Sequence, residues 1–423
     1  MKEEFLQYIW KHKLYNSSEL KTIKEEKVLI LNPGISNTDS GPDFFNAKIK
    51  IDSTVWAGNV EIHINSSDWH VHKHHHDKAY DNVVLQVVYK HDKEITNTKG
   101  NEIPTLEIDF DHRLLNNYKT LLNKESWISC QNDLPKVDSF TTQNWLDKLT
   151  IERLEEKSEG INQLLHKTNN SWETSFYILL ALNFGFKLNA EPFEQLAKSL
   201  PLKYLAKHKD NLLQIEALLF GQAGFLTDEA GDEYFEKLKA EYLYLQNKFN
   251  LKGIEKHIWK FLRSRPGNFP TLRIAQFAKL IYNSNSLFSK ILEAKTLGEF
   301  YKLFMVKPSD YWENHYVFNK ESLQKTKALG KSAIDILLIN TVIPFLFVYA
   351  KSKRLDDLQD DALGLLEKIK PEKNHIINKW EGLGIKSQSA YQTQALIQLK
   401  NRYCNHKKCL NCQIGNYLIR DIK

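Results

Sequence analysis

The sequence has few cysteines, and it has neither an apolar leader nor a long uninterrupted apolar run. Four cysteines among 423 residues are too few for a small secreted scaffold that is stapled by disulfides. The stretch 1–5, MKEEF, contains no apolar signal core. The longest apolar run, 333–350, contains Asp335, Asn340 and Pro344, whereas a membrane span needs ~20 predominantly apolar residues. We therefore expect a cytoplasmic protein without a membrane partner, and a buried helix at 333–350.

Charge of one sign is also not in large excess. The chain has 58 Lys and Arg against 52 Asp and Glu, which gives a net charge of +6 at pH 7. This near balance permits nucleic-acid binding but does not require it, because only a local basic patch would be decisive. A chain of 423 residues is too long for one ordinary hydrophobic core, so we expect two or three domains.

The two parts of the chain differ in the period of their apolar residues. Residues 1–115 combine an N-terminal helical stretch with short apolar runs, which predict an α/β or α+β domain whose mixed sheet has about five strands. Residues 141–423 carry apolar residues at helical spacing and predict a large all-α domain. Between them, the stretch 116–140 includes the loop-like sequence around Cys130 and is the predicted linker.

Two acidic residues in the first domain have the placement of a cation site. In the stretch 60–64 (VEIHI), apolar residues alternate with Glu61 and His63, so these two side chains point off the apolar face of a strand. If Asp43 lies at the end of a neighbouring strand, its carboxylate approaches the same point. Two carboxylates and an imidazole suit a divalent cation, which is a common means of attacking a phosphodiester. The alternative is that Asp43 caps a turn while Glu61 and His63 face solvent.

The Pro-Asp pair that ends at Asp43 and the Glu-Ile-His triplet that begins at Glu61 resemble the PD-(D/E)XK nuclease superfamily. The resemblance covers the first domain. It implies a restriction-endonuclease-like sheet, Mg²⁺ or Mn²⁺ at Asp43 and Glu61, and hydrolysis of DNA. His63 stands where the superfamily has lysine, and Lys48 on the adjacent strand is a candidate for the missing positive charge. The absent lysine also allows a second interpretation, a non-catalytic nucleic-acid-binding protein with a decayed nuclease core.

The segment 70–76 contains five histidines, which is an unusual density. On a strand, every second residue from His70 to His76 would share one face, whereas in a helix His72 and His76 would lie at positions i and i+4. Neutral imidazoles bind zinc, manganese or iron well. Together with His63, this segment gives a third hypothesis, a histidine-rich transition-metal protein or enzyme. The alternative is a solvated polar loop.

Three of the four cysteines lie close together in the sequence. Cys404, Cys409 and Cys412 fall within nine residues, and the last two have the C-x-x-C spacing of metal knuckles. With the distant Cys130 they predict one four-thiolate site for zinc or a [4Fe–4S] cluster. The arrangement is similar to iron–sulfur-stapled nucleases of recombination repair, although there the nuclease core lies between the cysteines. His406 in place of Cys130, or free buried thiols, are the alternatives.

Three arginines surround a Pro-Gly turn in the helical part. Arg263, Arg265 and Arg273 are candidates for contacts with nucleic-acid phosphates, because the guanidinium fork is planar and permanently charged. The alternative is that they pair or cap within a helical bundle.

Several stretches are similar to a bacterial family that is described as a domain of unknown function. They are 32–34, 41–44, 58–63, 215–226, 265–273 and the terminal cysteines. This similarity joins the segments into one unit and implies no activity. The main hypothesis from the sequence is therefore a magnesium-dependent nuclease acting on DNA, with the oligomeric state left open.

Overall fold

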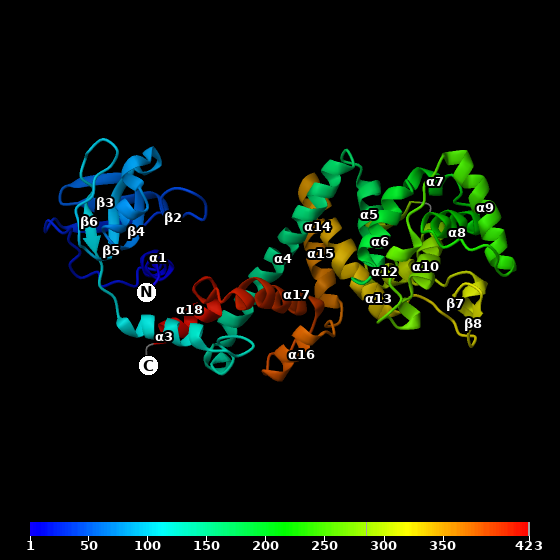
Figure 1. The fold of residues 1–423 in the computed structure, drawn as a ribbon. Helices are drawn as coiled ribbons and strands as arrows, with labels where there is room; N and C mark the ends of the chain where they lie inside the picture. The colour runs from blue at the N-terminus through cyan, green and yellow to red at the C-terminus, as the bar shows by residue number, and fades with distance from the viewer. Residues whose placement is uncertain (285, 422–423) are drawn as a thin grey trace. The chain divides into compact units, whose positions relative to one another are not determined.

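The computed structural model describes residues 1–284 and 286–421 and divides the chain into two compact units (Figure 1). The first unit contains Met1–Trp145 and the segment that begins at Leu399, and the second contains Leu146–Gln398. A mixed sheet near the N-terminus is followed by a largely helical region, as the apolar periodicity predicts. The division differs from the predicted boundaries at residues 115 and 140, because the C-terminal segment groups with the N-terminal residues.

The sheet of the first unit has six strands. They are β1 (Val28–Asn32), β2 (Ile35–Ser36), β3 (Phe44–Ile51), β4 (Thr54–Asn65), β5 (Val83–Lys90) and β6 (Thr105–Glu107). The path β1-β3-β4 is antiparallel, the path β4-β5-β6 is parallel, and β2 pairs with β3. Parallel pairing of β4 with β5 requires a crossover connection. That connection consists of α2 (Asp68–Val71) and two 3₁₀ turns, His74–His76 and Lys78–Tyr80.

Strands β3 and β5 are buried to different extents because their surroundings differ. In β3, Ala47 and Ile49 are buried while Lys48 is exposed, which is the alternation of a strand with one covered face. In β5, nearly every position from Val83 to Val88 is buried, as expected for a central strand that is paired on both sides. Gln86 is the one polar residue in that run and is 0% exposed, so its side chain must find partners inside the protein.

Helix α1 (Glu3–Lys11) packs against β4 and ties the N-terminus to the sheet. Its buried side is aromatic: Phe5 stacks on Tyr118 with ring centroids 5.3 Å apart and meets Phe110 edge-on at 5.6 Å. Glu3 lies in the first turn, where the positive end of the helix dipole favours an acidic side chain.

The predicted linker 116–140 is largely structured. Helix α3 (His112–Asn123) covers its first part, and a 3₁₀ turn at Leu134–Lys136 lies near its end. The C-terminal segment runs through a π-helical turn (Leu399–Tyr403), two 3₁₀ turns (Cys404–His406 and Cys409–Asn411) and α18 (Gln413–Arg420). Helices α18 and α3 are in contact, and Asn117 Nδ2 donates to the carbonyl oxygen of Ile419 at 3.1 Å.

The second unit is helical, with a two-stranded ribbon of β7 (His315–Val317) and β8 (Lys320–Glu321). Its helices are α4 (Ser139–Lys167), which begins in the first unit, α5 (Trp172–Phe184), α6 (Ala190–Ser199), α7 (Leu202–Ala206), α8 (Leu212–Gln222), α9 (Glu233–Phe249), α10 (Pro270–Asn283), α11 (Leu287–Glu293), α12 (Leu297–Phe304), α13 (Lys331–Leu337), α14 (Ile343–Lys353), α15 (Asp356–Lys368), α16 (His375–Gly382) and α17 (Ala390–Gln398). Helices α8 and α10 form the middle of its core, because they are buried at most positions.

One helical stretch, Lys331–Lys353, is long and apolar enough by length and composition to cross a membrane. It comprises α13, a π-helical turn (Leu338–Val342) and α14, and 72% of its most apolar window is buried inside the protein. Asn340 in the π turn accepts a hydrogen bond from Lys157 Nζ at 3.1 Å. The apolar run predicted as a buried helix is therefore mostly covered by the rest of its unit.

Two helical glycines offer a matched test of the packing in the second unit. A Cβ added at Gly221 of α8 would lie 2.1 Å from the ring of Tyr242 in α9, whereas one added at Gly160 of α4 would meet nothing within 4 Å. We expect Gly221→Ala to lower the free energy of unfolding by about 1–3 kcal/mol through overpacking. We expect Gly160→Ala to raise it by about 0.5–1 kcal/mol through helix propensity. Urea unfolding followed by circular dichroism measures both, and equal effects of the two substitutions would contradict the close contact of α8 with α9.

Candidate metal centre

The structure brings the two acidic residues of the first domain together. Asp43 directly precedes β3 and Glu61 lies in β4, and the antiparallel register places Phe44 opposite Val60. The backbone N–H of Asp43 donates to Glu61 Oε2 at 3.0 Å, and the N–H of Ile62 donates to Asp43 Oδ2 at 3.0 Å. Each carboxyl group therefore accepts a hydrogen bond from the backbone of the segment that carries the other carboxyl group.

Glu61 is buried and Asp43 is half-buried. Glu61 is 5% exposed, so the interpretation that it faces solvent is wrong. Burial raises the pKa of Glu61 to about 8, with a further contribution from the charge of Glu3 in α1. Burial and the nearby charge of Glu61 raise the pKa of Asp43 to about 7, although Asp43 Oδ1 accepts a hydrogen bond from Gln7 Nε2 at 2.8 Å. Two neighbouring carboxyl groups with little access to water are stabilised either by protonation or by a bound cation.

Three histidines lie on the other side of Glu61. Glu61 Oε1 is 3.3 Å from His74 Nε2 and 3.6 Å from His63 Nε2. His63 Nε2 is in turn 3.2 Å from His72 Nδ1. One ligand atom from each of the three imidazoles lies within 4.8 Å of the others. The three imidazoles thus offer nitrogens at a spacing that one metal ion can bridge, and the Glu61 carboxylate lies beside two of them.

Neighbouring side chains fix the orientation of these imidazoles. His63 Nδ1 is 3.0 Å from Gln86 Nε2, which also donates to the Ser66 carbonyl oxygen at 3.2 Å. His74 stacks on Tyr80 with ring centroids 3.7 Å apart. Burial lowers the pKa of His63 to about 3, so its ring is neutral at physiological pH, which is the form that binds metals.

The sequence did not indicate every member of this site. Gln86 has a signal, since it interrupts an otherwise apolar strand sequence. Gln7 and Glu3 have none, because their contact with the site depends on how α1 packs against the sheet. Lys48, predicted as a helper, is exposed on β3 and pairs with Ala57, and its role stays a prediction.

The histidine-rich segment does not form the face that a strand would give. It consists of α2 and a 3₁₀ turn, so of the two alternatives for 70–76 the strand is wrong, and the helical pair of His72 and His76 does not form within one continuous helix. His72 and His74 join His63, while His75 makes ring contacts with His70 at 4.7 Å and with His76 at 3.9 Å. A strand would be too straight to bring two members of the segment back onto β4.

The four cysteines form a second group in the same unit. All are free of disulfides, and Cys412 is buried while the other three are partly buried. Burial raises the pKa of the Cys130 thiol, and charges on Cys412 and Cys409 raise it further. A single site for Cys130 and the terminal trio stays a prediction.

The three arginines lie in the second unit. Arg273 is 7% exposed, donates to Gln276 Oε1 at 2.8 Å and lies 4.3 Å from the ring of Phe186. Burial lowers its pKa to about 10. Arg263 and Arg265 are exposed, and a contact of these two with nucleic acid stays a prediction.

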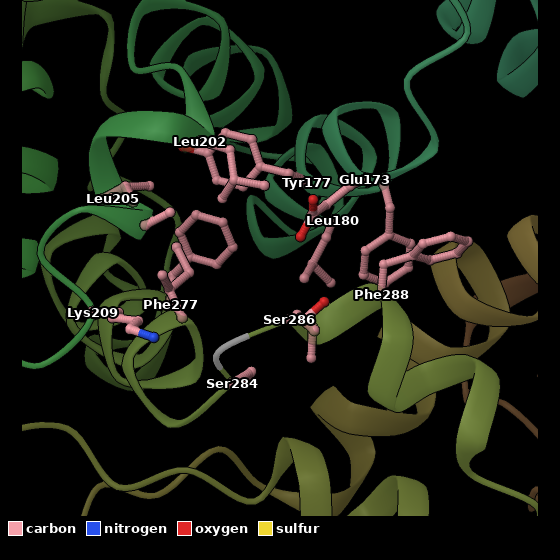
Figure 2. A pocket seen from close by; sticks show the side chains of 14 residues that line it. Glu173, Tyr177, Leu180, Leu202, Leu205, Lys209, Phe277, Ser284, Ser286 and Phe288 are labelled. Atoms are coloured by element: carbon pink, nitrogen blue, oxygen red, sulfur yellow. The ribbon is translucent and has the colours of Figure 1, made fainter.

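A pocket in the second unit lies among α5, α7, α10 and α11 (Figure 2). Its lining is mostly apolar and aromatic, with Tyr177, Leu180 and Phe277 among the side chains that face the opening. Glu173 and Lys209 are its charged members. No group of metal ligands accompanies them among the described lining residues, and we assign this pocket no chemistry.

In the presence of excess EDTA, Glu61→Gln is expected to stabilise the protein at pH 8 and to change little at pH 5. The folded protein holds the pKa of Glu61 at about 8, above its ordinary value of 4.5. The part of the folding stability that depends on a protonated Glu61 is fully present below the pKa that Glu61 has in the unfolded chain. It is lost as the pH rises through the pKa that Glu61 has in the folded protein. We expect a gain of about 2 kcal/mol at pH 8 and less than about 0.5 kcal/mol at pH 5.

Urea unfolding at both pH values measures this difference. Glu25→Gln is the control, because Glu25 is an exposed partner of Lys21 whose loss should matter little at either pH. A Glu61→Gln variant that is less stable than the unsubstituted protein at pH 8 would contradict the conclusion that ionisation of the buried Glu61 carboxyl destabilises the fold.

Comparison with known proteins gives a family and no activity. No curated protein and no solved structure matches the chain. The match to a family model covers residues 3–375, which include the whole candidate metal centre and Cys130 and stop before the terminal cysteines. The chain belongs to the family described as "Protein of unknown function (DUF2851)".

Proposed function

We propose that the first unit is a metal-dependent phosphodiesterase, a nuclease acting on DNA, whose cation is held by Glu61 and the histidines. One observation carries this proposal: Glu61 lies between Asp43 on one side and the nitrogens of His63 and His74 on the other. A buried carboxylate that lies near a second carboxyl group and beside neutral imidazoles is stabilised by a positive charge.

The ligand types select the kind of cation. Oxygen ligands alone would suit magnesium, whereas imidazoles suit zinc, manganese and iron. His63, His72 and His74 therefore favour a transition metal over Mg²⁺ at this site. When bound, such an ion polarises a phosphoryl oxygen and lowers the pKa of a bound water.

The chain's own residues have separate tasks in this proposal. Glu61, His63, His72 and His74 would hold the ion, and Gln86 keeps the ring of His63 in place. Asp43 has its carboxyl group fixed by the Ile62 N–H and by Gln7. With a pKa raised to about 7, Asp43 is suited to accept a proton from the attacking water near neutral pH.

The order of elements supports phosphodiesters as the substrate class. A helix, an antiparallel run of strands, a crossover and a parallel strand follow one another as α1, β1, β3, β4, α2 and β5. This is the order expected for a PD-(D/E)XK core, with Asp43 before one strand and Glu61 on the next. His63 stands at the lysine position but is neutral, since burial lowers its pKa to about 3. It is therefore better suited to bind a metal than to supply positive charge.

Metal binding is tested by a matched pair of histidine variants. His72 and His76 are both exposed in the same segment, and only His72 belongs to the three-histidine group. We expect His72→Ala to weaken Mn²⁺ or Zn²⁺ binding at least tenfold, and His76→Ala to leave it within about twofold. Isothermal titration measures both affinities, and quenching of Trp69 is a second readout because its ring lies 5.2 Å from that of His74. Equal affinities in the two variants would remove the proposed ligand set.

Catalysis is tested with end-labelled single- and double-stranded DNA in the presence of Mn²⁺. We expect Asp43→Asn to reduce cleavage about 100-fold while the protein stays folded, and His76→Ala to cleave at the unsubstituted rate. Cleavage that survives Asp43→Asn would overturn the role of Asp43. If the protein binds DNA and metal but does not cleave, the result supports a non-catalytic protein with a decayed nuclease core. If it binds metal but not DNA, the result supports a histidine-rich metal protein.

A further inference from the structure

The cysteine group is built from two segments that are distant in sequence and belong to the first unit. Cys130 lies in the turn before the 3₁₀ turn Leu134–Lys136, and its carbonyl oxygen accepts from the N–H groups of Asp133 and Leu134. The other three cysteines come from the 3₁₀ turns and the start of α18. Charges on the other three cysteines each raise the pKa of Cys404, after burial. Direct contacts also join the two segments: Lys400 Nζ donates to the Trp127 carbonyl oxygen at 2.6 Å, and Lys407 Nζ donates to the Leu122 carbonyl oxygen at 2.6 Å.

The backbone around this group is shaped to leave sulfur atoms near N–H donors. Cys412 is the N-cap residue of α18. Burial raises the pKa of its thiol, and the backbone N–H groups of Gly415 and Ile414 oppose part of that rise. Backbone N–H groups at the positive end of a helix favour a thiolate over a thiol. A Cβ on residue 415 would lie 2.2 Å from the Cys409 carbonyl oxygen, so this approach requires glycine.

Further donors and positive charges face the same group. Burial raises the pKa of Cys409 and of Cys404. The Ser129 hydroxyl and the charge of Lys407 oppose part of that rise at Cys409, and the charge of Lys400 does so at Cys404. These groups offset part of the negative charge that four thiolates would bring, whereas four neutral thiols would need none of them.

The spacing of the sulfur atoms bears on what they could hold. In the part of the chain that the structure describes, the histidine group is the one set of three or more candidate ligands whose atoms all lie within 4.8 Å of one another. Thiolates bound ~2.3 Å from a single tetrahedral zinc ion stand only about 4 Å apart. The four cysteines are therefore spread more widely than one zinc ion requires, and a multi-iron cluster fits the wider spacing better.

We propose that Cys130, Cys404, Cys409 and Cys412 bind one [4Fe–4S] cluster. The cluster fastens the C-terminal segment, including α18, to the turn that follows α3. It is independent of the histidine centre, because the two groups share no residue.

The test uses the full chain purified without oxygen. We expect about four irons and four acid-labile sulfides per chain, with a brown colour from the cluster. Cys130→Ser should lose most of the iron and sulfide. His406→Ala should keep both, because His406 is exposed on the same turn and is not a proposed ligand. His72→Ala should also keep the sulfide, which separates this result from failure of the histidine centre.

A second measurement does not depend on variants that fold. Thiol alkylation followed by mass spectrometry should find all four cysteines protected in the native chain and reactive once the cluster has been oxidised away. One zinc per chain that disappears in Cys130→Ser would overturn the iron–sulfur assignment. Four thiols that react freely in the native, metal-poor chain would overturn the site as a whole. Loss of the metal in His406→Ala but not in Cys130→Ser would replace Cys130 with His406.

Discussion

The close approach of Asp43 and Glu61, whose carboxyl groups each accept a hydrogen bond from the backbone of the other's segment, is the constraint on which the candidate site depends. Glu61 is buried and Asp43 is half-buried, and two such acids repel each other once ionised. The strand register makes this approach unavoidable, because Phe44 is opposite Val60 and the reciprocal N–H bonds hold the two strands. The pairing that builds the sheet therefore also creates a place where positive charge is required.

The connection between β4 and β5 places candidate metal ligands at this point. A parallel pair of strands needs a crossover, and here the crossover carries His72 and His74 back over β4. The crossover is anchored by Trp69, whose indole donates to the Thr96 carbonyl oxygen at 3.0 Å, and by Tyr80 stacked on His74. The crossover that the parallel pair requires thus also places the imidazoles of His72 and His74 near Glu61.

The two ligand groups of the first unit differ in chemical softness. The group on the sheet offers carboxylates and imidazoles, and the group at Cys130 and the C-terminal segment offers sulfur. Nitrogen and oxygen ligands suit zinc, manganese or iron ions, whereas thiolates select softer centres such as iron–sulfur clusters. In the functions that we propose, this difference would let the two groups take different metals without competition. It also separates the proposed chemistry, on the sheet, from a structural fastening of the C-terminal segment.

Apolar periodicity alone determined the strand-rich first part, the helical remainder and the buried stretch at 333–350, because these features depend on neighbours along the chain. The alternation at 60–64 likewise put Glu61 and His63 on one face of a strand. Only the tertiary structure decided that this face is buried, which histidines meet there, and that Gln7 and Gln86 complete the site. It also decided that the segment from Leu399 groups with the N-terminal residues. Contacts between distant segments are fixed by packing, and packing leaves no periodic signal in the sequence.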